Sequence, residues 1–144
     1  MNNDDNKHLN WRPFSKYALA KRRAKKIALI RNYFQENKVL EVSTPILSTS
    51  AVSDTSIESI NTNLSISPSE KFYLQTSPEF FMKRMLADGF GDIFQVCKVF
   101  RDDELGRLHL PEFTMIEWYR LNFNLKNIIN DTLNIITLIL HDQY

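Results

Sequence analysis

Two strand-like segments joined by a polar loop constrain the fold of this 144-residue chain more than any other feature. Residues 93–101 and 112–121 are rich in apolar and aromatic side chains, and residues 102–111 form a polar connection between them. Two such runs, close together in the sequence, pair most simply as an antiparallel hairpin with a long loop. We therefore expect a sheet built around this hairpin.

Helical periodicity marks three further segments. Residues 15–37 carry apolar side chains at three- and four-residue steps, with Ser15 as a candidate cap. Pro78 opens a second helix that ends at residues 89–91. In the third, one helical face carries Leu125, Ile128, Ile129, Leu133, Ile136 and Leu140. We expect that face to lie in the core, and Asp131 to face solvent.

Shorter strands are expected between the first two helices. Residues 39–44 suit a strand that Pro45 ends, because proline cannot donate to a sheet ladder. Residues 58–65 and 71–75 suit two more strands, with a turn at 67–69. The resulting order predicts an α+β fold with a mainly antiparallel sheet flanked by helices.

The composition excludes several functional classes. With 18 Lys and Arg residues against 17 Asp and Glu, the net charge of +1 gives no overall field for nucleic acid or an acidic membrane. Three glycines are too few for a Walker-type loop or a complete GxGxxG fingerprint. The single cysteine, Cys97, reads as a packing residue, and no His or Cys spacing supports zinc. A single cysteine cannot form an internal disulfide, so we expect a cytoplasmic protein, and no apolar run could cross a bilayer.

Strand alternation gathers chemically useful side chains on the hairpin. Phe113, Glu117 and Tyr119 share one face of the second strand, and Arg101 extends one face of the first. If these faces coincide, one surface offers a guanidinium, an aromatic ring, a carboxylate and a phenol. Such a set suits a nucleotide linked to a cationic small molecule. An amphipathic sheet with ordinary cross-strand pairs explains the same spacing.

Three segments resemble the class II aminoacyl-tRNA synthetases. Residues 100–120 resemble motif 2 in its lysine-type version, residues 39–47 resemble motif 1, and residues 76–84 resemble the segment that meets the amino acid. The chain has no room for an anticodon-binding domain. Ser77 and Trp118 resemble the residues found at these motif positions in a stand-alone branch of the lysine-type enzymes. That branch activates (R)-β-lysine with ATP and transfers it to a lysine of elongation factor P, without tRNA.

The resemblance implies residue roles. Arg101 would be the catalytic clamp on the α-phosphate, and Phe113 would stack on adenine. The implied ATP site consists of Arg101, Asp102, Asp103, His109, Leu110 and Phe113. The implied amino-acid site consists of Ser77, Pro78, Glu79, Glu117 and Tyr119. Asp103 and Leu110 depart from the family's usual glutamate and asparagine, which makes ATP affinity the property most affected.

Nothing after Tyr119 resembles motif 3, so the chain is similar to the N-terminal half of a class II catalytic domain. We expect a flexible arm over 1–12 and a partial catalytic domain over 13–144. The magnesium ligands would lie in the other half, and the sequence itself predicts no metal ligands. We expect little ligase activity from the chain alone, an uncovered sheet edge, and a homodimer through the motif 1 region. A fragment of a lysyl-tRNA synthetase and a non-catalytic dimerisation module remain alternatives.

Overall fold

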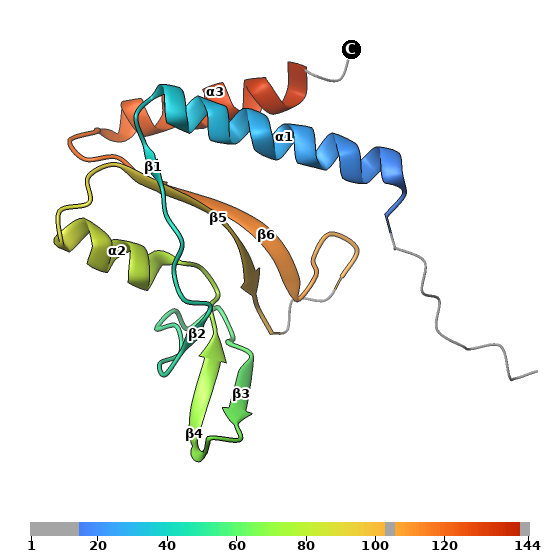
Figure 1. Ribbon diagram of the computed structural model, residues 1–144, viewed down its shortest axis with the longest axis vertical. Helices are drawn as coiled ribbons and strands as arrows, with labels where there is room; N and C mark the ends of the chain where they lie inside the picture. The colour runs from blue at the N-terminus through green and yellow to red at the C-terminus, as the bar shows by residue number, and fades with distance from the viewer. Residues whose placement is uncertain (1–14, 103–105, 142–144) are drawn as a thin grey trace, which may run out of the picture.

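The structure is a computed structural model that describes residues 15–102 and 106–141. Its helices are α1 (Tyr17–Glu36), α2 (Glu79–Ala87) and α3 (Leu125–His141). One sheet has the order β1-β5-β6, with strands β1 (Leu40–Glu41), β5 (Ile93–Phe100) and β6 (Glu112–Tyr119). The other has the order β2-β4-β3, with strands β2 (Leu47–Ser48), β3 (Asn61–Leu64) and β4 (Ser67–Leu74). Figure 1 shows α1 and α3 side by side on one face of the β5–β6 hairpin, and α2 on the other.

The central hairpin has the expected pairing. Strands β5 and β6 are antiparallel from the pair Ile93–Tyr119 to the pair Phe100–Glu112, in unbroken register. Strand β1 lies parallel to β5, whereas the β2–β4 and β3–β4 pairs are antiparallel. The expected α+β class with a mainly antiparallel sheet is confirmed. Strand β6 lies at the edge of its sheet in the part of the chain that the structure describes.

The main core lies between the hairpin and the two long helices. Phe34 of α1 is fully buried and stacks on Phe94 of β5, with ring centroids 4.3 Å apart. Ile30, Val39 and Ile135 complete the buried cluster. Half-buried apolar side chains of β5 and β6 pack against it, namely Val96, Ile116 and Trp118. One face of the hairpin is thus covered by α1 and α3, which leaves the opposite face for other contacts.

Helix α2 packs on that opposite face through a smaller cluster. Met82 is fully buried against Val42 and Ile93, with Tyr119 beside them. The helix ends where the sequence predicts, because Gly89 adopts a φ of +86° that L side chains rarely take. The N–H of Phe90 then donates to the carbonyl of Met85 over 3.1 Å, which closes the last turn. This stop directs the chain into β5.

Three local expectations are wrong. The segment at 39–44 is a strand only over Leu40–Glu41, because the chain leaves the sheet as it approaches Pro45. The turn expected at 67–69 lies instead at 65–66, and Pro68 belongs to β4. Proline is tolerated there because the β3–β4 register shifts after Asn63, which interrupts the ladder. Helix α1 begins after Lys16 with no side-chain cap, so Ser15 does not cap it.

The last helix departs furthest from expectation. Five of the six side chains of its predicted core face are exposed, including Leu125 at 76% and Leu133 at 55%, and the buried apolar side chain of the helix is Ile135. Asp131, expected in solvent, is buried. It accepts a 2.6 Å hydrogen bond from the phenol of Tyr33, and its carboxylate lies 3.8 Å from the guanidinium of Arg120. The position that the sequence assigned to solvent therefore joins α3 to α1 and to the residue that follows β6. The expected arm over 1–12 lies outside the described residues.

Candidate functional site

The register of the hairpin places the predicted side chains on a common face, which we call the site face. Val99 lies opposite Phe113, and Gln95 lies opposite Glu117. Directly opposed residues of an antiparallel pair project to the same side of a sheet. The guanidinium of Arg101 lies over the ring of Phe113, 5.2 Å from its centroid. The two faces therefore coincide, as the resemblance requires.

Glu117 and Tyr119 form a second pair on the site face. The Tyr119 phenol donates a 2.7 Å hydrogen bond to the Glu117 carboxylate. Burial raises the pKa of the Glu117 carboxyl, and the nearby charge of Glu79 adds to that shift. Burial also raises the pKa of the Tyr119 phenol, as does its hydrogen bond to Glu117. The charge of Lys83 acts in the opposite direction on the Glu117 carboxyl, without cancelling the effect of burial, and the Tyr119 phenol stays a proton donor.

The start of α2 brings the other predicted amino-acid contacts beside this pair. Pro78 is fully buried at the position that precedes the helix. The Ser77 hydroxyl accepts a hydrogen bond from the Glu79 N–H over 3.2 Å, and Glu79 pairs with Lys83 one turn later. A hydrogen bond from Ser77 also lowers the pKa of Glu117, against the larger effect of burial. Two carboxylates and two hydroxyls thus converge at one end of the site face.

Gln75 ties the end of β4 to the end of β5. The side-chain amide of Gln75 donates to the backbone carbonyl of Lys98 over 2.8 Å, and the backbone carbonyl of Gln75 accepts from the N–H of Phe100 over 2.9 Å. Its backbone N–H donates to the carbonyl of Ile46, which continues the tie to the segment before β2. Because Gln75 precedes Ser77 by two residues and Phe100 precedes Arg101, this tie holds the two predicted subsites together.

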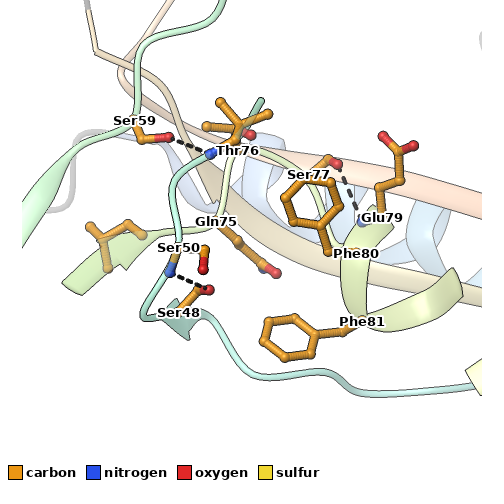
Figure 2. Close-up of a pocket in the computed structure, with 11 residues that line it drawn as sticks. Ser48, Ser50, Ser59, Gln75, Thr76, Ser77, Glu79, Phe80 and Phe81 are labelled. Atoms are coloured by element: carbon orange, nitrogen blue, oxygen red, sulfur yellow. Dashed lines mark hydrogen bonds between the residues drawn. The ribbon is translucent and has the colours of Figure 1, made fainter. Parts of the chain in front are cut away.

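A pocket adjoins Ser77 and Glu79. Figure 2 shows its labelled lining, Ser48, Ser50, Ser59, Gln75, Thr76, Ser77, Glu79, Phe80 and Phe81. One wall of the pocket is formed by Ser48, Ser50 and Ser59. The Ser48 hydroxyl accepts a hydrogen bond from the N–H of Ser50, and the Ser59 hydroxyl accepts one from the N–H of Val52. Sequence reasoning missed this wall, because a run rich in serine and threonine indicates a loop and says nothing of what the loop faces. Helical spacing after Pro78 was the available signal for Phe80 and Phe81.

The loop residues predicted to contact ATP do not lie together as the amino-acid contacts do. His109 and Leu110 lie in an exposed turn, where the N–H of Gly106 donates to the His109 carbonyl over 3.1 Å. Leu110 is 62% exposed. Asp102 follows Arg101 and is exposed, with its N–H bonded to the carbonyl of Glu58. Asp103 lies outside the described residues. Here the structure shows loop positions on the rim of the site face and no enclosed contact.

Cys97 lies on the site face rather than in the main core. Its side chain is half-buried, and burial raises the pKa of the thiol. The negative charge of Glu117 raises this pKa further, by a smaller amount. Within residues 15–102 and 106–141, no cluster of three or more His, Cys, Asp or Glu side chains is placed to hold a metal ion. No helix in that same part is both long and apolar enough to span a membrane.

Replacing Glu117 by glutamine should make stability less dependent on pH. A carboxyl whose pKa is raised on folding favours the folded state while protonated, and this contribution is lost as pH rises through the raised pKa. We expect Glu117→Gln to match the native chain at about pH 4 and to exceed its free energy of unfolding at about pH 7. Urea denaturation at both values measures this, with the exposed Glu36→Gln as control. A larger gain in the free energy of unfolding at about pH 4 than at about pH 7 would contradict the argument from burial.

Two comparisons place these observations among known proteins. A sequence model of the family described as tRNA synthetases class II (D, K and N) matches residues 3–143. The chain is 47% identical over 134 residues to a protein of Avibacterium paragallinarum, with 90% of this chain and 41% of that protein aligned. It is 46% identical over 135 residues to one of Pasteurella multocida, with 91% and 42% aligned. Both are named elongation factor P–(R)-beta-lysine ligase, and the chain spans about two fifths of their length.

Proposed function

Because this chain belongs to the class II (D, K and N) tRNA synthetase family, we propose that it supplies the ATP and amino-acid contacts of a ligase. That ligase activates (R)-β-lysine, or lysine, as an adenylate and transfers it to a lysine of elongation factor P. The observation that carries the proposal is the shared face of Arg101, Phe113, Glu117 and Tyr119. The names of the relatives support the choice of amino acid and acceptor.

The first step joins the amino acid to AMP. A carboxylate oxygen of the amino acid attacks the α-phosphorus of ATP, and the bond to pyrophosphate breaks. Negative charge builds on the equatorial oxygens of that phosphorus, so a fixed guanidinium stabilises the transition state more than the ground state. Arg101 has the required chemistry, and its position over Phe113 puts it beside a ring that can stack on adenine.

The amino-acid end explains the pair of carboxylates. The proposed substrate carries two ammonium groups, and a buried ammonium without a partner is costly. Glu79 and Glu117 supply opposite charge, and the cost of burying the Glu117 charge falls once a cation lies against it. Ser77 and Tyr119 add hydroxyls that can orient the same groups. The serine-lined pocket next to Ser77 extends the space available to the substrate.

The second step transfers the aminoacyl group. The side-chain amine of the acceptor lysine attacks the carbonyl carbon, AMP leaves, and the nitrogen loses a proton. Magnesium would neutralise charge on the triphosphate, and we propose from the family resemblance that its ligands belong to the remaining part of the catalytic domain. We further propose that the chain alone has negligible activity, works in the cytoplasm, and dimerises through the motif 1 region.

The test is acceptor choice. Labelled (R)-β-lysine and ATP are given to this chain, alone and co-produced with the rest of the Avibacterium ligase, with elongation factor P or tRNA as acceptor. We expect label on elongation factor P only in the co-produced sample. Label on tRNA would favour a lysyl-tRNA synthetase fragment. Dimerisation without ATP binding would favour the non-catalytic module, and adenylate formed by the isolated chain would overturn the expected inactivity.

A further inference from the structure

Gln75 takes the place of a strand residue at the end of β5. Strand β1 pairs with β5 as far as Phe94. Further along the same edge of β5, the Gln75 carbonyl accepts from the Phe100 N–H, and the Gln75 side-chain amide donates to the Lys98 carbonyl. A residue of a parallel strand opposite Val99 would make these same two bonds. Gln75 therefore continues the hydrogen bonding of this edge beyond the end of β1.

The side chain is needed for this arrangement because the backbone N–H of Gln75 is already used. That N–H donates to the Ile46 carbonyl over 2.8 Å, on the side of β2. The donor for the Lys98 carbonyl must therefore come from the side chain, and the amide of glutamine reaches it over 2.8 Å. Almost any residue at position 75 could keep the two backbone bonds, whereas the bond to Lys98 requires a side-chain N–H of this length.

The Gln75 amide is only half satisfied. Gln75 is 7% exposed, and its Oε1 atom accepts no hydrogen bond from the described residues. Figure 2 shows this side chain among those that line the pocket beside Ser77. A buried acceptor without a donor is unfavourable, and an apolar side chain of similar volume avoids that penalty. Stability alone therefore does not explain a glutamine at this position.

The tie made by Gln75 spans the two parts of the predicted site. Ser77 follows Gln75 by two residues, and Arg101 comes directly after Phe100. On the opposite edge of β5, the Arg101 N–H donates to the Pro111 carbonyl over 2.9 Å. The backbone around Arg101 is thus held from both edges, by the other arm of the hairpin and by Gln75. Loss of the Gln75 side-chain bond would weaken one of these two attachments.

We propose that Gln75 is a positioning residue of the proposed ligase, and that its side-chain amide sets the separation between the amino-acid contacts and the Arg101 guanidinium. This inference rests on the proposed function. Adenylate formation needs the amino-acid carboxylate in line with the α-phosphorus, and an error of about 1 Å in such an alignment can slow a reaction roughly 10²-fold. Each subsite keeps its own side chains without the tie, so the binding of each substrate is little affected.

The test measures kcat and KM for exchange of labelled pyrophosphate into ATP, with this chain co-produced with the rest of the Avibacterium ligase. Gln75→Met keeps a similar volume and loses the donor. We expect kcat to fall roughly 10- to 100-fold, while KM for ATP and for (R)-β-lysine changes less than about twofold. Gln75→Glu, which has the same shape but no N–H, should lose at least as much. Gln35→Met, on the exposed surface of α1, should change neither constant.

Two measurements on this chain alone separate positioning from folding. Gln75→Met should leave the midpoint of urea unfolding nearly unchanged, because the Lys98 carbonyl loses its donor as the unpaired Gln75 Oε1 is removed. The same change should slow alkylation of Cys97 by iodoacetamide, because a hydrogen bond from Gln75 lowers the pKa of this thiol. Cys97 is the single cysteine of the chain, so the rate reports this site. Gln35→Met should again have no effect.

Three results would overturn the proposal. A rise in KM with an unchanged kcat would indicate a direct binding role for Gln75. A fall in kcat together with a large fall in the urea midpoint would indicate a purely structural role. Unchanged alkylation of Cys97 would mean that the amide does not make the contacts on which the tie depends. Absence of exchange in the unaltered sample would instead overturn the proposed function, and the alkylation rate would still decide whether the tie exists.

Discussion

Replacing Arg120 by alanine should lower the free energy of unfolding by about 3–5 kcal/mol, the usual cost of breaking a buried ion pair from one side. The Arg120 side chain is 8% exposed, and its guanidinium lies 3.0 Å from the carboxylate of Asp92 and 3.8 Å from that of Asp131. It also lies over the ring of Phe123, 4.3 Å from the centroid. Alanine would leave the buried Asp131 without a cation and remove this stacking.

The control is another arginine with a carboxylate partner. Arg31 pairs with Glu41 at 2.9 Å, but the two side chains are 47% and 39% exposed. Arg31→Ala should therefore cost about 1 kcal/mol or less. Urea denaturation measures both variants, and Arg120→Met separates lost packing from lost charge. Equal costs for Arg120→Ala and Arg31→Ala would mean that burial adds nothing to the network of Arg120.

Replacing Arg101 by alanine should slow adenylate formation about 10²–10³-fold, as removal of one preorganised transition-state donor usually does. Arg101→Lys should recover only part of this rate, because an ammonium cannot make the two parallel bonds of a guanidinium. The measurement is exchange of labelled pyrophosphate into ATP, using this chain co-produced with the remainder of the Avibacterium ligase.

Arg22 provides the matched control, because it is exposed on α1 and carries the same charge. Arg22→Ala should leave the exchange rate unchanged. Similar losses for Arg22→Ala and Arg101→Ala would indicate a general charge effect, and the phosphate contact assigned to Arg101 would then be wrong.

Features specified by short-range patterns could be predicted from the sequence. Alternation placed Phe113, Glu117 and Tyr119 on one face of their strand but left open whether the Arg101 face coincides with it, which the register of the hairpin then showed. The stop of α2 followed from Gly89, whose positive φ few other residues accept. The resemblance then gathered Ser77 and Glu79 beside Glu117, and the structure brings these groups together. The catalytic and binding roles of these residues stay predictions.

Features that depend on distant partners could not be predicted. A lone aspartate in a helix indicates solvent, and the burial of Asp131 follows only from Tyr33 and Arg120, which lie on other elements. The apolar period of α3 predicted a core face that is largely exposed, and the buried side is centred on Ile135 instead, because periodicity identifies apolar residues but cannot say which of them the rest of the fold covers. The serine wall around Ser48 likewise depends on how a loop returns to the sheet.

The tie made by Gln75 has a consequence for motion. Its backbone and side chain connect the end of β4 to the residue before β2 and to the last residues of β5 through three hydrogen bonds. We therefore expect bending of the β3–β4 hairpin, which extends away from the β5–β6 hairpin (Figure 1), to pivot near Gln75 and to leave the separation of Ser77 and Arg101 little changed. Thermal motion of the outer hairpin would then leave the spacing between the predicted amino-acid and phosphate contacts unaffected.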